Sequence, residues 1–238
     1  MKALLYKELK LALHPICIVF VLLFPLLTLV PSYPLAMGFI YVLSCYPILF
    51  LGANKGQQSN DLLFSTLLPV RKKDIVLARI FTILILQFTF MAIMSALYPL
   101  TSIIESNYIA ERIAEKIAAG KTMEEIGPQT AGFGLESFAA VLGFGIIGFS
   151  VADIVFFPIY YKHGRSIVAS TLCTILGFAA YLGIFTIALP LLSPAYMSFF
   201  KDNIWIQIGF LGVSLFISAG MHFLVYKIAS KNLEKVDF

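Results

Sequence analysis

The feature that most constrains this chain is a series of apolar runs, most of them close to the length of a transmembrane helix. Such a helix needs about 20 mainly apolar residues to cross about 30 Å of hydrocarbon. Six runs qualify as candidate spans: residues 16–30, 35–52, 75–98, 137–160, 166–189 and 205–226. The chain is 60% hydrophobic and 13% charged, with a mean hydropathy of +0.92, unlike a soluble domain. We therefore predict an all-α polytopic membrane protein in which residues 1–238 form a single transmembrane domain.

The N-terminal stretch 1–14 has apolar side chains at a spacing of three to four residues and lysines on the other side of the predicted helix. The apolar residues are Leu5, Leu9, Ala12 and Leu13, and the lysines are Lys7 and Lys10. This pattern predicts an amphipathic helix that lies in the membrane interface. Pro15 then allows the chain to bend into the first apolar run, which is short for a span.

Six spans place both termini on the same side of the membrane. All but four of the 17 Lys and Arg residues fall on that side, the exceptions being Arg112, Lys116, Lys121 and Lys201. Loops on the cytoplasmic side of membrane proteins carry the excess of Lys and Arg. We therefore expect a multi-pass protein of the cell membrane with both termini in the cytoplasm.

The cytoplasmic loop at 53–74 contains a short predicted helix at 61–68. Ser59 or Asn60 can cap its first turn, and Pro69 ends it. The helix begins with Asp61 and presents an apolar face of Leu63, Phe64, Leu67 and Leu68, with Leu62 beside it. Such a helix either docks on a partner protein or lies in the headgroup layer beside anionic lipid.

A cationic cluster of Arg71, Lys72 and Lys73 follows this helix and suits lipid headgroups or an acidic partner. Asp74 is positioned to cap the next span, and Pro99 to close it.

The outer region at 100–135 forms a helical loop in this prediction. Ile109, Ile113 and Ile117 repeat every four residues among charged side chains, and Gly120 ends the predicted helix. This helix can lie on the outer leaflet or cover an exit path.

Asp153 is an acid well inside the fourth predicted span. A charge at the centre of a spanning helix costs about 2.5 to 3.5 kcal/mol, so Asp153 should face protein or water. We expect Arg79, Lys162 or Arg165 as its partner, either in a structural pair or in a transport cycle.

Glycines at 143, 145 and 148 share the fourth predicted span with Asp153. Small residues let helices approach closely where lipid gives apolar side chains no reason to associate. We expect close helix packing at these glycines and no phosphate site.

Catalytic and metal-binding signatures are missing from the sequence. It contains neither GxxxxGK(S/T) nor HExxH, so no catalytic or metal-ligating residues are assigned. His14, His163 and His222 are scattered near the predicted membrane boundaries, where histidines are usually interface residues. The spread of positive charge also gives no footprint for nucleic acid.

The three cysteines, Cys17, Cys45 and Cys173, all fall in apolar runs, and we expect them to act as small hydrophobic side chains.

Three stretches resemble the ABC-2 type permeases of ATP-driven exporters. The stretch LLFSTLLPVRKKDIVLARI (62–80) is similar to the family's leucine-proline, basic, Asp-Ile-Val-x-Ala-Arg/Lys sequence. FFPIYYKHGR (156–165) is similar to the turn after the family's fourth span, and KALLYKELK (2–10) to its interfacial helix.

The resemblance implies a six-helix subunit that pairs with a second copy of itself or a related permease and sits on a separate ABC-type ATPase. Residues 61–68 would then be the helix that couples to the ATPase, and MgATP would bind the partner, with no cofactor in this chain. Compact members of the family export amphipathic peptides such as phenol-soluble modulins, so we expect an exporter of similar amphiphiles that is not itself an enzyme. The alternatives are a membrane-embedded immunity or binding protein against a peptide toxin and an intramembrane enzyme.

Overall fold

The computed structural model describes residues 2–12, 18–30, 70–120, 138–163, 167–184 and 203–235. All regular secondary structure in these residues is helical. The helices are α1 (Lys2–Ala12), the π-helix η1 (Val19–Leu23), the 3₁₀-helix η2 (Phe24–Leu29), α6 (Lys72–Ala118), α8 (Phe138–His163), α9 (Ile167–Gly183) and α12 (Ile204–Glu234). The predicted all-α class is therefore confirmed for this part of the chain.

The membrane character of the protein is visible in three of the described helices, α6, α8 and α12, which are long and apolar enough to cross a bilayer. Helix α9 is equally apolar but shorter. The predicted run at 35–52 and the predicted coupling helix at 61–68 lie outside the described residues. The plan of six spans therefore stays a prediction.

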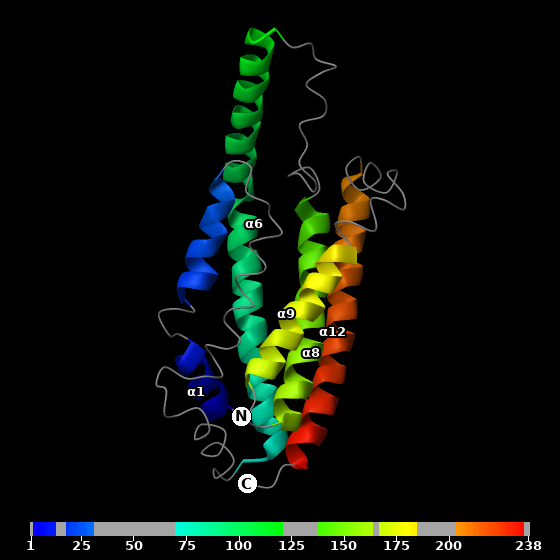
Figure 1. Ribbon diagram of the computed structural model, residues 1–238. Helices are drawn as coiled ribbons and strands as arrows, with labels where there is room; N and C mark the ends of the chain where they lie inside the picture. The colour runs from blue at the N-terminus through cyan, green and yellow to red at the C-terminus, as the bar shows by residue number, and fades with distance from the viewer. Residues whose placement is uncertain are drawn as a thin grey trace.

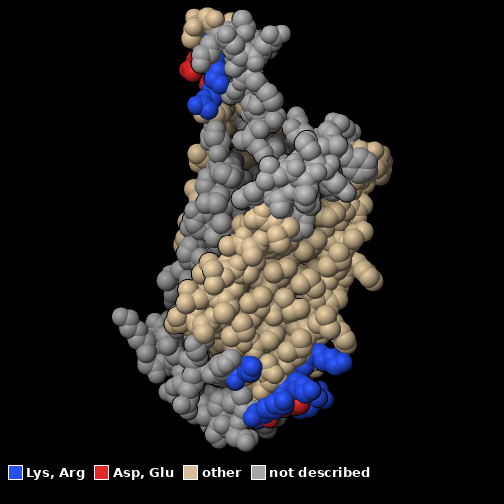
Figure 2. All heavy atoms as spheres, turned by 45° about the vertical axis from the view of Figure 1, so that its right-hand side comes forward, with Lys and Arg blue, Asp and Glu red and all other residues tan. Residues whose placement is uncertain are grey.

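The long helices form an elongated bundle (Figure 1). Helix α8 packs most extensively against α12 and α9, whereas α6 packs against α12, α1 and η2. The start of α6 and the ends of α8 and α12 lie at the same end of the bundle as α1 (Figure 1). We call this the basic end, because Lys and Arg side chains gather there below an apolar belt (Figure 2).

Helix α6 does not close at Pro99 as predicted, but continues to Ala118 and extends beyond the bundle (Figure 1). Proline removes one backbone donor from a helix, so Pro99 cannot donate to the Ser95 carbonyl oxygen four residues before it. The Thr101 hydroxyl lies 2.9 Å from the carbonyl oxygens of both Leu97 and Tyr98 and donates its one proton to this adjoining turn. Gly120 ends the helix as expected, with a positive φ of 80°.

Helix α6 also begins differently from the prediction. The N-cap residue is Arg71, and Asp74 lies in the first turn. The Arg71 guanidinium donates to both carboxylate oxygens of Asp74, at 3.1 and 3.2 Å. This interaction raises the pKa of Arg71. A carboxylate in the first turn is also favourable because the helix dipole is positive there.

Two of the predicted glycine contacts are confirmed on α8. A Cβ atom added at Gly143 would lie 2.8 Å from ring carbons of Phe210 in α12, and one added at Gly148 would lie 2.8 Å from the ring of Phe178 in α9. Tyr181 packs on Gly148 as well, and its hydroxyl donates to a carbonyl oxygen of α8 at 2.7 Å. The two glycines thus let α12 and α9 approach α8 closely.

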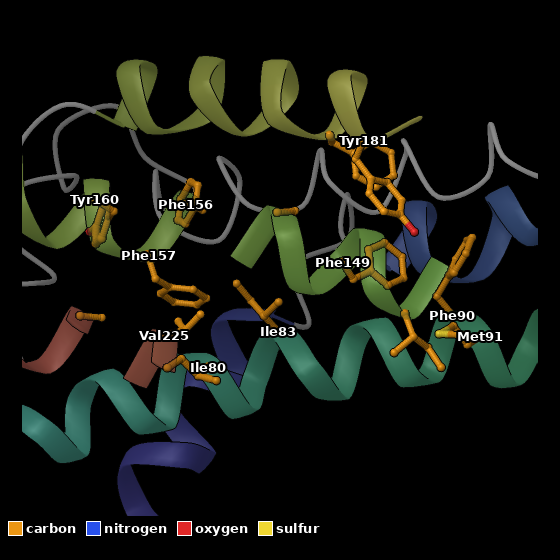
Figure 3. Packing of buried hydrophobic residues seen from close by; sticks show 14 of the residues in the cluster. Ile80, Ile83, Phe90, Met91, Phe149, Phe156, Phe157, Tyr160, Tyr181 and Val225 are labelled. Carbon is orange, nitrogen blue, oxygen red and sulfur yellow. The ribbon is translucent and has the colours of Figure 1, made fainter. Parts of the chain in front are cut away.

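Aromatic and branched side chains fill the space between α6 and α8 (Figure 3). Ile83 and Phe90 of α6 face Phe149 and Phe157 of α8. The rings of Phe90 and Phe149 meet edge to face, with their centroids 6.4 Å apart. This core positions the buried polar groups described below.

We predict that Gly143→Ala and Gly148→Ala each destabilise the protein by about 1 to 3 kcal/mol, because the added methyl group overlaps an aromatic ring. The measurement is thermal denaturation of the full chain in detergent micelles. Gly212→Ala in α12 is the matched control, since no atom lies within 4 Å of its added Cβ. Equal melting temperatures for Gly143→Ala and Gly212→Ala would contradict the close approach.

Candidate functional site

The predicted site residues divide between the described and undescribed parts of the chain. The predicted coupling residues Asp61, Leu62, Leu63, Phe64, Leu67 and Leu68 lie outside the described residues. The cationic cluster of Arg71, Lys72 and Lys73 lies at the start of α6, at the basic end. Lys73 also forms an exposed ion pair of 3.3 Å with Glu234 near the end of α12.

A buried junction joins three helices at the basic end, and we define it by Glu8, Arg79, Tyr160 and Tyr161. Arg79 of α6 is only 5% exposed. Its Nε lies 3.5 Å from Glu8 Oε2 of α1, and its Nη1 donates to the Tyr160 hydroxyl of α8 at 3.2 Å. The fully buried Tyr161 packs against Tyr160, with ring centroids 5.1 Å apart. One guanidinium therefore contacts both α1 and α8.

The buried face of α1 differs from the predicted one. Leu4 and Glu8 are buried, whereas Leu5 and Leu9 are only half-buried. Leu4 packs with Ile75 and Ala78 of α6. The helix turns its acid toward α6 because a buried Arg79 requires an opposite charge nearby. Apolar spacing alone does not reveal that requirement.

All three stretches that resemble the permease family contribute to this junction. Glu8 belongs to the stretch 2–10, Arg79 to 62–80, and Tyr160 and Tyr161 to 156–165. The sequence resemblance did not require these stretches to be neighbours. The junction is therefore a place where residues of all three segments lie in contact.

A second buried polar cluster joins α6, α8 and α12, and we call it the polar seam. Its residues are Gln87, Ser150, Asp153, Ser218 and His222, all 9% exposed or less. Gln87 Nε2 donates to Asp153 Oδ2 at 3.1 Å, and His222 Nε2 lies 2.9 Å from the same oxygen. The hydroxyl groups of Ser150 and Ser218 are 2.7 Å apart.

The partners found for Asp153 differ from those predicted. Arg79 lies about two helical turns before Gln87 on α6 and contacts Glu8 and Tyr160 in the junction. Lys162 is exposed at the end of α8, and Arg165 lies outside the described residues. The described partners of Asp153 are therefore the neutral amide of Gln87 and the imidazole of His222, where a Lys or Arg had been predicted.

His222 is buried in the seam, so the prediction that it is an interface residue is wrong. The position of His222 near a predicted membrane boundary does not indicate that it is buried. The spacing of the polar residues on α12 could have indicated its burial. Ser214, Ser218 and His222 recur every four residues and thus share one face, and all three are buried. The opposite face is apolar and exposed, as at Phe216, which is 83% exposed.

The seam contains serine, histidine and aspartate, but its geometry does not activate the serine as a nucleophile. His222 Nδ1 lies 3.3 Å from the Ser218 hydroxyl and closer, at 2.7 Å, to the backbone oxygen of Ser218, which can only accept. Nδ1 therefore carries a proton and cannot take one from the Ser218 hydroxyl. The arrangement holds helices together and does not prepare Ser218 for attack on a substrate. Among the described residues, no group of three or more potential metal ligands was found.

Comparisons with protein-family models, with curated proteins and with solved structures gave no match. The class that the described helices define is that of a helical membrane protein.

We predict an energetic coupling of roughly 2 kcal/mol between Glu8 and Arg79, in the range for residues in direct contact. Each single variant leaves one charge buried without its partner, which is costly. The two single losses of unfolding free energy should therefore add up to more than the loss in the double variant. The measurement is a cycle of Glu8→Gln, Arg79→Gln and the double variant, followed by chemical denaturation in micelles.

The exposed pair of Lys73 and Glu234 is the matched control for this cycle. Water screens it, so its coupling should be roughly 0.5 kcal/mol. A coupling between Glu8 and Arg79 no larger than that of the control would show that the junction does not fasten α1.

Proposed function

We propose that this chain is the permease subunit of an ATP-driven exporter that moves amphipathic peptides or similar amphiphiles out of the cell. The single observation that carries the proposal is the contact of Arg79 with both Glu8 and Tyr160. This contact joins the three segments that resemble ABC-2 type permeases. A chain that only resembled the family locally would have no reason to bring those segments together.

The junction suits the transmission of force. Arg79 lies about two helical turns after the start of α6, and the predicted coupling helix at 61–68 directly precedes that start. Movement of this helix by an ATPase would displace the start of α6. Arg79 would pass the displacement to α1 through Glu8 and to α8 through Tyr160.

Helix α12 is tied to the same end by two further contacts. Lys73 pairs with Glu234, and the Asn232 side chain donates to the Pro158 carbonyl oxygen of α8 at 3.0 Å. In this proposal the ends of α6, α8 and α12 at the basic end move together. Their movement then displaces the parts of these helices that cross the membrane.

The implied partners follow from what the sequence lacks and where its charges lie. Without a phosphate-binding loop of its own, the chain depends on an ABC-type ATPase that binds MgATP. A second copy or a related permease completes the pathway. The basic end faces the cytoplasm, where Arg71, Lys72 and Lys73 are close to anionic lipid headgroups.

The first test is purification of the full chain from its native membrane with its associated proteins. We expect an ABC-type ATPase, identified by mass spectrometry, whose hydrolysis rate rises in the presence of this chain. A complex free of any nucleotide-hydrolysing protein would contradict the proposal.

We also predict that the double variant Leu63→Asp/Leu67→Asp loses the stimulation of ATP hydrolysis while its insertion into the membrane is unchanged. Two charges on the apolar face of the predicted helix would prevent it from docking in an apolar cleft. The double variant Ser65→Asp/Thr66→Asp is the matched control, because these residues lie on the opposite face of the same predicted helix. Unchanged stimulation in the first variant would remove the coupling role of 61–68.

A further inference from the structure

We propose that Asp153 and His222 form a proton-binding site inside the bundle, and that the bound proton fastens α12 to α6 and α8. The ligand is a single proton shared between His222 Nε2 and Asp153 Oδ2, which are 2.9 Å apart. The proposal does not depend on the transport function, since it concerns only contacts within this chain.

The hydrogen-bond partners of His222 fix the number of protons. Its Nδ1 faces the Ser218 carbonyl oxygen at 2.7 Å and must donate to it. Its Nε2 faces the Asp153 carboxylate, and two acceptors at this distance need one proton between them. Whether that proton resides on nitrogen or on oxygen, the histidine and the aspartate together bind two protons.

Removal of the shared proton breaks the arrangement. Nδ1 keeps its proton because it still faces a carbonyl oxygen, so Nε2 would turn a lone pair toward the carboxylate. Two acceptors in contact repel each other, and the low dielectric inside the bundle strengthens the repulsion. Because Asp153 belongs to α8 and His222 to α12, the repulsion acts directly between these two helices.

Helix α6 is linked to the same event through Gln87. Its amide donates to Asp153 Oδ2, the oxygen that shares the proton. When His222 withdraws, this oxygen loses its contact with α12, while the bond from Gln87 of α6 remains. Whether the shared proton is bound therefore affects how α6, α8 and α12 pack together.

Other titratable groups lie away from the pair in the described part of the chain. On α6 the nearest charged residue is Arg79, which contacts Glu8 and Tyr160 in the junction. On α12, Tyr226 and Lys227 follow His222 by about one turn toward the basic end. Helix α6 also carries Tyr98, about three turns after Gln87. Helix α8 carries Tyr160, Tyr161 and Lys162 toward the basic end, and helix α9 carries Cys173 and Tyr181. The η1 and η2 helices have no titratable side chain.

The residual exposure of the seam lies on the α12 side. His222 is 9% exposed and Ser218 7%, whereas Asp153 is 1% exposed and Ser150 fully buried. The carboxylate of the pair is therefore more deeply buried than its histidine partner.

The test is thermal denaturation of the full chain in lipid nanodiscs from about pH 5 to about pH 10, the range that spans the ordinary titration of histidine. We expect the wild-type melting temperature to fall on the alkaline side by at least about 3 °C, a shift typical of losing one contact in a chain of this size. Asp153→Asn should abolish this step, because an asparagine amide can donate its own N–H to Nε2 without a titratable proton.

Ser214→Ala is the matched control, since Ser214 is a buried polar residue on the same face of α12 whose hydroxyl bonds only within its own helix in the contacts found. It should keep the wild-type step. A step of the same size in wild type and Asp153→Asn would overturn the proposal.

A second measurement keeps the proposal testable if Asp153→Asn does not fold. In a His14→Gln/His163→Gln variant, ¹⁵N NMR of labelled histidine reports His222 alone. We expect Nδ1 to stay protonated across the range while the proton at Nε2 is lost in one step. An Nδ1 without a proton, or no loss at Nε2 up to about pH 10, would contradict the shared proton.

Discussion

Lipid gives apolar helices no hydrophobic reason to associate, so close packing and buried polar contacts hold the described bundle together. Helices α9 and α12 approach α8 where glycines leave room for aromatic rings. Helix α6 has fewer direct contacts with α8, and buried polar groups at two depths link it to that helix. Arg79 makes the link at the basic end, and Gln87 makes it deeper in the bundle. Contacts of this kind are directional, so they fix how the helices are rotated as well as how close they lie.

The two polar clusters have different chemistry and suit different tasks. The junction relies on a guanidinium, which stays charged at all relevant pH values, paired with the Glu8 carboxylate. The seam relies on a carboxylate and an imidazole, whose proton can come and go. Both clusters include a residue of α6, and this helix directly follows the segment where an ATPase would dock. In the proposed function, a displacement of α6 would reach the seam as well as the junction.

The sequence predicted the all-α class and the three long apolar helices because apolar length and glycine position act locally. The predicted span at 16–30 is instead described by the short π- and 3₁₀-helices η1 and η2. Gly120 ended α6 as expected, since a left-handed residue is a local requirement. Pro99 did not end it, because a proline removes a single donor and the backbone bonds on either side of it hold a helix that continues to Ala118. The partners of Asp153 were missed because distance along a helix does not show which residues of other helices lie at the same depth. Only the four-residue spacing of polar side chains on α12 held a clue to His222.

The central claim is that this chain receives motion from an ATPase and passes it through the bundle. A spin-label distance measurement between Ile103 and Ile204 tests this most directly, because both side chains are exposed, at 59% and 63%, and lie on different long helices. Serine would first replace the native cysteines Cys17, Cys45 and Cys173. We predict that MgATP changes the distance distribution in the complex with the ATPase and has no effect on the chain alone. An identical distribution with and without MgATP in the active complex would contradict the claim.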